Sequence, residues 1–302
     1  MLKGILLYLT RERMEAPAVK LLLRKLEKAE ITYFFSPMPA TLSATAFPTT
    51  IAVQTMPLSF SPEECLVLTD SASGISSAQA AGIPCLGYAP PEHSEDLFGA
   101  YALFEDFSSI DVAYLCRTHA HAMGYPADIL STERLFVREF SREDFPALYA
   151  MCTESSTAAS MEEALSDYDT EKEKHTAYLR NVYPFFDLAL WGVYEKSSGK
   201  LIGRAGFSLP EDDSDTFSLG YLIDVPYRKQ GFAKELIPAL LFYAKEQGYE
   251  KVSARIKKRN VASVKALTQC GFPYLCKEDS VTSTLTYLIR LTVSSPSLQT
   301  DK

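Results

Sequence analysis

The 302-residue sequence contains no apolar run that approaches the length of a membrane span, so no membrane partner is expected. Its start, Met1-Leu2-Lys3, leads into a short strand candidate and lacks the layout of a cleavable signal. The six cysteines form no C-x-x-C pair and no regular framework, which indicates free thiols in a reducing compartment. Together these absences predict a cytoplasmic protein.

Basic residues are also in deficit. The formal net charge is −8 at pH 7, which argues against a nucleic-acid partner, although the local cluster Lys257-Lys258-Arg259 could still meet a phosphate. Histidine is scarce, and the one close pair, His119 and His121, would point to different faces of the helix expected around it. We therefore expect two surface histidines and no metal site.

A chain of this length predicts two domains, and the first 126 residues alternate strand and helix patterns. Apolar strand candidates at 2–9, 31–35, 65–69, 84–88 and 102–104 are separated by helix candidates at 17–30, 73–81 and 109–122. This alternation predicts a parallel sheet in a small Rossmann-like domain over residues 1–126. Residues 36–61 are rich in Pro, Ser and Thr, which indicates an irregular insertion.

Residues 66–84, which read LVLTDSASGISSAQAAGIP, resemble one segment of haloacid dehalogenase-like hydrolases. The resemblance implies that Asp70 would help to hold a magnesium ion. The nucleophile of that family lies in an Asp-x-Asp motif after the first strand, but this chain has Leu9-Thr10-Arg11-Glu12 there, so nothing can accept a phosphoryl group. We predict a catalytically silent relative whose sheet end at Asp70 could still bind a ligand or a partner.

The segment Gly124-Tyr125-Pro126-Ala127-Asp128 interrupts the periodic patterns and is the expected domain boundary. A second domain is predicted over residues 133–293, followed by a disordered tail at 294–302. Its first helix opens with a cap box, Ser141-x-x-Asp144. The strand candidates of this domain lie at 134–139, 185–194, 200–209, 217–225, 251–256, 274–277 and 283–293. The predicted fold class is α/β, with a small Rossmann-like parallel-sheet domain followed by a mixed α/β domain.

The turn Arg228-Lys229-Gln230-Gly231-Phe232-Ala233 joins a predicted strand to a predicted helix. Such a connection leaves unpaired N–H groups at the start of the helix, where the helix dipole also favours an anion. Gly231 lets the backbone approach a ligand, and Arg228, Lys229 and Lys234 add positive charge. The turn is therefore a candidate phosphate site, with an ordinary strand–helix connection as the alternative.

Four features in fixed order resemble the GNAT superfamily of acyl-CoA-dependent N-acyltransferases. They are Gly220-Tyr221-Leu222-Ile223, Arg228-x-x-Gly231-x-Ala233, Asn260-x-x-Ser263 and Gly271-Phe272. The resemblance covers residues 133–293, and its nearest branch acetylates ribosomal protein N-termini and contains many small-molecule acetyltransferases. It implies acetyl-CoA as the cofactor. The residues implied to bind it are Ile223, Val225, Arg228, Lys229, Gln230, Gly231, Phe232, Ala233, Lys234, Asn260 and Ser263.

The resemblance also implies direct attack of a neutral amine on the acetyl-CoA thioester, with a backbone N–H near Ile223 to stabilise the oxyanion. Many members protonate the departing thiolate with a Tyr seven residues after the Asn, but this chain has Leu267 there. Ser263 is the favoured catalytic donor in its place, because its hydroxyl can donate a proton; a capping or packing role is the alternative.

The general base stays open, because many relatives carry a Glu where this chain has Ser218. Tyr221, a water chain or an acid from residues 153–174 could serve. In the resembled family that segment forms a wall over the acceptor site. Its acidic residues could attract a cationic amine or could form a solvated face. They are Glu154, Glu162, Glu163, Asp167 and Asp169.

The expected function is acetyl-CoA-dependent N-acetylation of a primary amine, on a small molecule or on a protein N-terminus. The alternative is a non-catalytic regulatory protein that binds acetyl-CoA and docks a partner through its N-terminal domain. The residues at 218 and 267 lend the alternative some support. A homodimer is compatible with either function.

Overall fold

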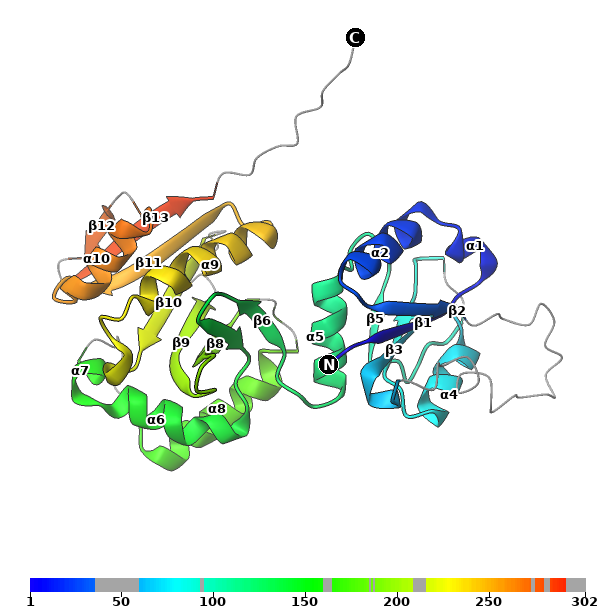
Figure 1. The fold of residues 1–302 in the computed structure, drawn as a ribbon, viewed down its shortest axis with the longest axis horizontal. Helices are drawn as coiled ribbons and strands as arrows, with labels where there is room; N and C mark the ends of the chain where they lie inside the picture. Colours follow the sequence, from blue (N-terminus) through cyan, green and yellow to red (C-terminus); the bar gives the residue numbers. More distant parts are fainter. Residues whose placement is uncertain are drawn as a thin grey trace, which may run out of the picture. The chain divides into compact units, whose positions relative to one another are not determined.

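The computed structural model describes residues 1–35, 60–92, 95–159, 165–184, 186, 188–208, 216–272, 275–279 and 283–291. Most of the predicted insertion and the whole of the predicted tail lie outside these ranges. The chain divides into two compact units, Met1–Ala127 and Asp128–Lys302, called here the N-terminal and the C-terminal unit (Figure 1). Each unit is described by itself.

The N-terminal unit is built on a five-stranded parallel sheet with the order β2-β1-β3-β4-β5, so the predicted parallel sheet is confirmed. Side chains of α2 and α5 pack in one apolar cluster and those of α4 in another, so the sheet is covered on both faces. Accordingly, β1, β3 and β4 are buried at every position. The elements are β1 (Gly4–Tyr8), α1 (Arg11–Met14), α2 (Pro17–Lys28), β2 (Thr32–Phe35), η1 (Pro62–Glu64), β3 (Cys65–Thr69), α4 (Ala72–Ala80), β4 (Cys85–Tyr88), β5 (Ala102–Phe104) and α5 (Val112–Ala122).

The expected surface location of His119 is wrong. Its side chain is 2% exposed, because α5 turns this side of the helix toward the interior of the unit, whereas His121 is half-buried. Burial lowers the pKa of the His119 imidazole, so the ring is neutral at pH 7. The described residues contain no group of three His, Cys, Asp or Glu side chains that could hold a metal ion.

The C-terminal unit is built on an eight-stranded sheet with the order β12-β13-β11-β10-β9-β8-β7-β6. All neighbours are antiparallel except β10 and β11, so the predicted mixed α/β fold is confirmed. The strands are β6 (Asp128–Ser131), β7 (Leu135–Arg138), β8 (Leu190–Glu195), β9 (Leu201–Ser208), β10 (Phe217–Ile223), β11 (Lys251–Lys257), β12 (Leu275–Asp279) and β13 (Thr284–Arg290). The helices are η2 (Arg142–Asp144), α6 (Phe145–Thr153), α7 (Ser155–Ala158), α8 (Tyr168–Asn181), η3 (Val225–Tyr227), α9 (Phe232–Glu246) and α10 (Val261–Gln269).

The two faces of this sheet carry different helices. Trp191, Ala205 and Tyr221 stand in register on one face, where the Trp191 ring meets Tyr243 of α9 at 5.4 Å between centroids. The opposite face holds the Leu190 side chain, and the Leu190 N–H donates to the Tyr178 hydroxyl of α8 at 2.8 Å. The sheet therefore separates an α9 face from an α8 face.

Local sequence signals account for several element boundaries. The predicted cap box is present, since the N–H and hydroxyl of Ser141 donate to Asp144 Oδ2 at 2.7 and 2.8 Å. Helix α9 continues past Pro238, although proline lacks the N–H that the interior of a helix uses. Strand β6 was not predicted, because its four residues carry no periodic pattern and form an edge that pairs only with β7.

Replacement of Leu240 by Ala is expected to destabilise the C-terminal unit by about 2–5 kcal/mol, because this α9 side chain is fully buried in the core. Trp191 is the single tryptophan of the chain, so its fluorescence during urea unfolding reports on this unit. Phe242→Ala in the same helix is the control, since Phe242 is 64% exposed. Equal midpoints for the two variants would contradict the packing of α9.

Candidate active site

Strands β10 and β11 are paired only where they begin. The register matches Phe217 with Val252 and Ser218 with Ser253, and beyond these pairs the two parallel strands diverge. A cavity of about 1420 Å³ occupies the opening. It is lined from both strands, from the turn before α9, from the start of α10 and from one side of α8.

The divergence leaves backbone donors of β10 facing the cavity. Antiparallel pairing alternates direction, and the N–H of Asp224 donates to the Ile202 carbonyl of β9 at 2.8 Å. The residues one position out of phase, Tyr221 and Ile223, therefore direct their N–H groups away from β9, toward the side where β11 has departed. The Ile223 N–H lies where the family resemblance implies a backbone donor for the oxyanion, and that role stays a prediction.

The turn between η3 and α9 has the geometry of an anion site. Gly231 has a φ of +87° and Lys229 a φ of +62°, so two left-handed residues turn the backbone inward. A Cβ at Gly231 would have one neighbour within 4 Å, the Arg134 Nη2 at 3.5 Å, so the turn is open. The first intrahelical bonds run from Lys234 and Glu235 to the Gly231 carbonyl, which leaves the N–H groups before them pointing outward.

Arg134 braces this turn from the residues that precede β7. Its Nε donates to Glu235 Oε2 at 2.7 Å, and its Nη1 donates to the Gln230 carbonyl at 3.0 Å. The guanidinium carbon also lies 4.4 Å from the centroid of the Phe232 ring. The start of α9 is thus fixed by a neighbour rather than by the turn alone.

The cavity brings together most of the predicted site residues. Those that line it are Tyr221, Ile223, Arg228, Lys229, Gly231, Phe232, Ala233, Lys234, Asn260 and Ser263. Two others do not line it. Val225 begins η3, because the strand ends at Ile223, and the amide of Gln230 donates to the Pro226 carbonyl at 2.8 Å.

Arg228 is engaged by the protein. Its Nε donates to the Ile223 carbonyl at 2.8 Å, its Nη1 to Ser156 Oγ at 2.9 Å and its Nη2 to Thr157 Oγ1 at 2.6 Å. These bonds tie the end of β10 to α7. Lys229 and Lys234 make no ion pair or hydrogen bond with any described side chain, so they are the cations that the turn offers to a phosphate.

Glu154 holds α7 in place. Its carboxylate accepts from the Ser156 hydroxyl and N–H at 2.5 and 3.0 Å and from the Thr157 N–H at 3.0 Å. The Ser156 bonds lower the pKa of Glu154 to about 2, so it is ionised at neutral pH. Glu154, Ser156, Thr157 and Arg228 form one chain of contacts, called here the α7 tie.

Three described acidic residues of the segment 153–174 bond to other parts of the protein, whereas Asp169 is exposed. Glu154 belongs to the α7 tie, and Asp167 caps α8 by accepting from the Thr170 N–H at 3.0 Å. Glu171 lines the cavity but pairs with Lys174 at 2.8 Å. Glu162 and Glu163 lie outside the described residues. Among the described acids only Glu171 is paired with a cation, and whether the others attract an amine or form a solvated face stays open.

Asn260 and Ser263 open α10. The Ser263 N–H donates to Asn260 Oδ1 at 3.2 Å, so Asn260 is the N-cap and its amide NH₂ remains available to a ligand. Burial raises the pKa of the Tyr221 phenol, and the nearby Ser263 hydroxyl lowers it in part. The two groups are neighbours without a well-formed bond, because the buried Tyr221 hydroxyl has no hydrogen-bond partner among the described residues.

Asp70 lies at the carboxyl end of β3 in the N-terminal unit, beside the residue that follows β1. Its Oδ2 accepts from the N–H and the hydroxyl of Thr10 at 3.2 and 3.1 Å, and its buried Oδ1 has no partner among the described residues. The order of the sheet reverses between β1 and β3, where ligands of such sheets bind. Binding at this end stays a prediction.

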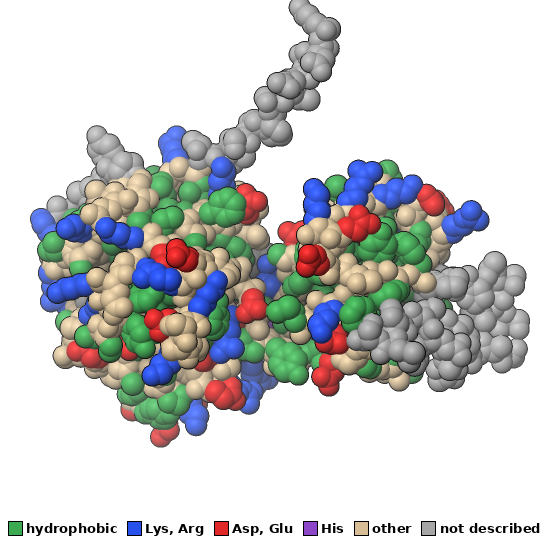
Figure 2. Space-filling view, in the orientation of Figure 1, with side chains coloured by type: hydrophobic (Ala, Val, Ile, Leu, Met, Phe, Trp, Pro, Cys, Tyr) green, Lys and Arg blue, Asp and Glu red, His purple; other side chains and the backbone are tan. Residues whose placement is uncertain are grey.

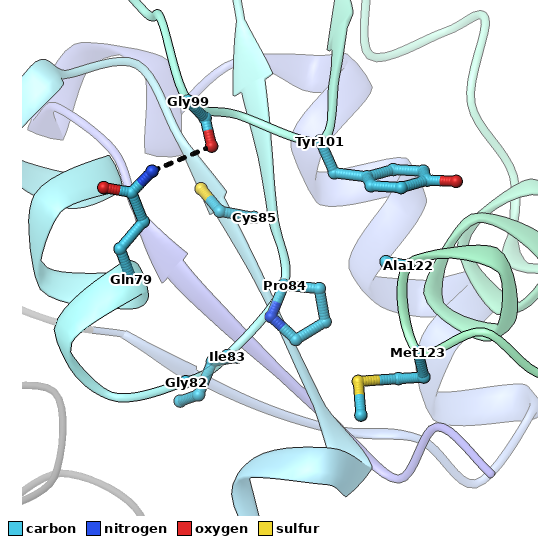
Figure 3. A pocket seen from close by; sticks show the side chains of 9 residues that line it. All are labelled: Gln79, Gly82, Ile83, Pro84, Cys85, Gly99, Tyr101, Ala122 and Met123. Atoms are coloured by element: carbon cyan, nitrogen blue, oxygen red, sulfur yellow. Dashed lines mark hydrogen bonds between the residues drawn. The ribbon is translucent and has the colours of Figure 1, made fainter.

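A smaller open cavity of about 390 Å³ lies at the other end of this sheet (Figure 3). Gln79 closes one side by donating to the Gly99 carbonyl at 3.2 Å, while Met123 and Tyr101 face it from the other. Burial raises the pKa of the Cys85 thiol to about 12, so no thiolate forms there at neutral pH. This cavity offers apolar contact rather than chemistry.

Arg228→Lys keeps the charge but cannot span the three acceptors of the α7 tie. We expect it to lower the stability of the C-terminal unit by about 1.5–3 kcal/mol, measured by Trp191 fluorescence in urea, with CoA affinity changed less than about threefold. Lys229→Met is the matched control and should show the reverse pattern. A loss of CoA affinity at unchanged stability in Arg228→Lys would assign the guanidinium to the phosphate.

Comparisons with known proteins agree on the C-terminal unit. A family model described as an acetyltransferase (GNAT) domain matches residues 134–273. The uncharacterized N-acetyltransferase YoaA of Bacillus subtilis is 26% identical over 153 residues, which are 48% of this chain and 82% of YoaA. YnaD, an uncharacterized N-acetyltransferase of the same organism, is 24% identical over 143 residues, 47% of this chain and 81% of YnaD.

A crystal structure of a GNAT-family acetyltransferase from Bacillus anthracis aligns with a TM-score of 0.46 and 19% identity, covering 54% of this chain and 98% of that one. Among the described residues, no helix is both long and apolar enough to cross a membrane. The family match lies wholly within the C-terminal unit. Residues 134–273 therefore form an acetyltransferase (GNAT) domain, and the cofactor of such domains is acetyl-CoA.

Proposed function

We propose that the C-terminal unit transfers the acetyl group of acetyl-CoA to a primary amine, on a small molecule or on a protein N-terminus. The opening between β10 and β11 carries the proposal. It joins an anion-binding turn, two unpaired strand donors and two hydroxyl side chains in one cavity. Lys and Arg side chains gather over α10 and the segment beside it, as suits a cofactor with several phosphates (Figure 2).

The residues present fit the cofactor. The outward N–H groups and the lysines of the turn would hold its pyrophosphate, and the free amide NH₂ of Asn260 would meet an amide of its pantetheine arm. Bound acetyl-CoA supplies an activated acyl group. The strand N–H groups of Tyr221 and Ile223 face the cavity with no competing strand, so they can stabilise negative charge on the carbonyl oxygen.

The reaction is the transfer of an acetyl group from the sulfur of the thioester to the nitrogen of the amine. A bond forms between the amine nitrogen and the carbonyl carbon while the bond between that carbon and sulfur breaks. The amine loses one proton, and the leaving sulfur gains one. The residues of the cavity have to orient the amine, which must be neutral to react, and to deliver the proton.

Ser263 and Tyr221 are the proton donors that the cavity offers. Because its pKa is raised, the Tyr221 phenol keeps its proton through neutral pH, which suits a donor and not a base. Ser263 lies beside it and has a rotatable hydroxyl. No acidic side chain without a partner faces the described part of the cavity, so we propose water as the general base.

A non-catalytic acetyl-CoA-binding protein is the second candidate, favoured by Ser218 and Leu267 at positions where the resembled family often has Glu and Tyr. Release of free thiol from acetyl-CoA against a panel of amines separates the two functions. The haloacid dehalogenase-like character of the N-terminal unit, its catalytic silence, a cytoplasmic location and a homodimer remain proposals of the same kind.

Gly231→Asp places a carboxylate in the anion-binding turn, and we expect CoA affinity measured by calorimetry to fall by at least about 100-fold. Gly231→Asn has nearly the same shape and a similar backbone cost without the charge, so it should lose far less. Gly199→Asp, in a hairpin with a φ of +67° and open space around it, is the control for strain. Unchanged affinity in Gly231→Asp would remove the turn from the site.

Ser263→Ala should lower kcat by about 10- to 100-fold with little change in the KM for acetyl-CoA, if its hydroxyl delivers the proton. Tyr221→Phe tests the neighbouring phenol in the same assay. A normal kcat in Ser263→Ala together with a loss in Tyr221→Phe would transfer the role to Tyr221.

Asn260→Ser keeps a helix cap but removes the amide NH₂, whereas Asn260→Ala removes both. We expect both variants to raise the KM for acetyl-CoA by a similar factor, because the amide and not the cap meets the cofactor. A raised KM in Asn260→Ala alone would mean that Asn260 serves only to form α10.

A further inference from the structure

The α8 face of strands β9 and β10 forms one wall of the cavity, called here the floor, and carries few large side chains. Facing pairs on β9 and β10 are Arg204 with Leu222, Gly206 with Gly220, and Ser208 with Ser218. At the centre, Gly220 leaves the backbone uncovered, because a Cβ there would meet only Leu190 Cδ2 at 3.6 Å, whereas a Cβ at Gly206 would clash with the Ala189 carbonyl. The floor therefore has a guanidinium at one end, a gap in the middle and two hydroxyls at the other end.

Arg204 is half-buried and makes no hydrogen bond or ion pair with any residue in the described ranges. It acts on its surroundings as a bare charge, since it lowers the pKa of the Cys152 thiol, which burial raises. Gly192 of β8 lies between Arg204 and Arg138 of β7 in the cross-strand register, so Arg138 is the next cation on this face. Arg138 is paired with Asp144 at 3.7 Å. A half-buried guanidinium that has no anionic partner among the described residues is incompletely compensated, so we look for its partner in a ligand.

The other charges of this half of the cavity cancel. Glu171 and Lys174 pair with each other on α8, and both also bond to Ser166. The net charge that the described residues present to an incoming acceptor is therefore that of Arg204. A polycationic acceptor would meet a like charge there, whereas an anionic group would meet a planar donor suited to two parallel hydrogen bonds.

Arg204 is also placed to meet the acceptor and not the cofactor. Its side chain stands on the α8 face, while Tyr221 stands on the α9 face beside Ser263 of α10. The cofactor phosphates already have the turn at Gly231 and the cations Lys229 and Lys234.

We propose that the acceptor amine carries a carboxylate close to its reacting nitrogen and that Arg204 binds this carboxylate. The inference rests on the proposed acetyl transfer and names its substrate class. The chemistry has two sources, a free amino acid or the N-terminus of a peptide that begins with an acidic residue. Both present a carboxylate within a few bonds of a primary amine.

The test compares matched acceptors in the full-length protein by thiol release from acetyl-CoA. Glycine, β-alanine and 4-aminobutanoate are each paired with their carboxamides, and a peptide that starts with Asp is paired with one that starts with Asn. Spermidine serves as the polycationic probe. For each pair, the ratio of kcat/KM for the acid to kcat/KM for the amide is measured in wild type and variants, so that differences in amine basicity cancel.

We expect Arg204→Gln to lower this ratio by about 10- to 100-fold for the preferred pair, with the KM for acetyl-CoA changed less than about threefold. Arg180→Gln is the matched control, because Arg180 is exposed on α8 and does not line the cavity. The pair that responds identifies the source as amino acid or peptide.

Acetylation of amines with an unchanged ratio in Arg204→Gln, or a wild-type preference for spermidine over every carboxylate, would overturn the inference and leave acetyl transfer intact. Turnover of none of the amines would overturn the proposed function, and the inference with it. If Trp191 fluorescence shows that Arg204→Gln is unfolded, Arg204→Lys replaces it in the test. Lysine keeps the charge but cannot make the two parallel hydrogen bonds of a guanidinium. The acid-to-amide ratio of kcat/KM for the preferred pair must then lie between the wild-type ratio and 1.

Discussion

Beyond Ser218 and Ser253 the strands β10 and β11 separate, and buried strand donors that a neighbouring strand would normally satisfy face a cavity instead. Such a break is stable only if other groups of the protein, or a bound ligand, form hydrogen bonds with the backbone groups that the missing strand leaves unpaired. Here the carbonyl of Ile223 is met by Arg228, whereas the N–H on the same side is left open. The position of α7, the exposure of the anion-binding turn and the passage between the two faces of the sheet all follow from this separation.

The sequence predicted the fold class of both units, because apolar periodicity and turn residues act locally. The strand at 65–69 matches its predicted bounds, since a clear signal closes it at both ends. Edge elements were harder to predict. Strand β6 takes its conformation from pairing with β7 and from packing against the core, and η3 replaces the last residues of a predicted strand because Asp224 caps it through the Val225 N–H. Neither constraint can be read from a local pattern.

The roles of site residues could be predicted where a motif determines the backbone conformation. They could not be predicted where a side chain can form bonds either with the protein or with a ligand. Gly231 and Asn260 take backbone roles, a left-handed turn and a helix cap, that their residue types favour. Arg228 was expected to bind the cofactor, and Glu154 was expected either to attract an amine or to lie on a solvated face, but the structure shows both within the α7 tie. Arg204 could not be predicted, because a charged residue in a strand belongs to no motif; that it has no partner among the described residues is shown only by the structure.

The brace from Arg134 has a consequence for where the catalytic unit can be cut from the rest of the chain. The family match begins at residue 134, but the turn at Gly231 depends on the Arg134 guanidinium and β7 depends on β6 for its outer hydrogen bonds. A fragment that started at Leu135 would lose the brace and expose β7 as an unpaired edge, a surface on which other chains can add as strands. The smallest autonomous piece would thus have to begin before Asp128, several residues ahead of the first recognisable trace of the family.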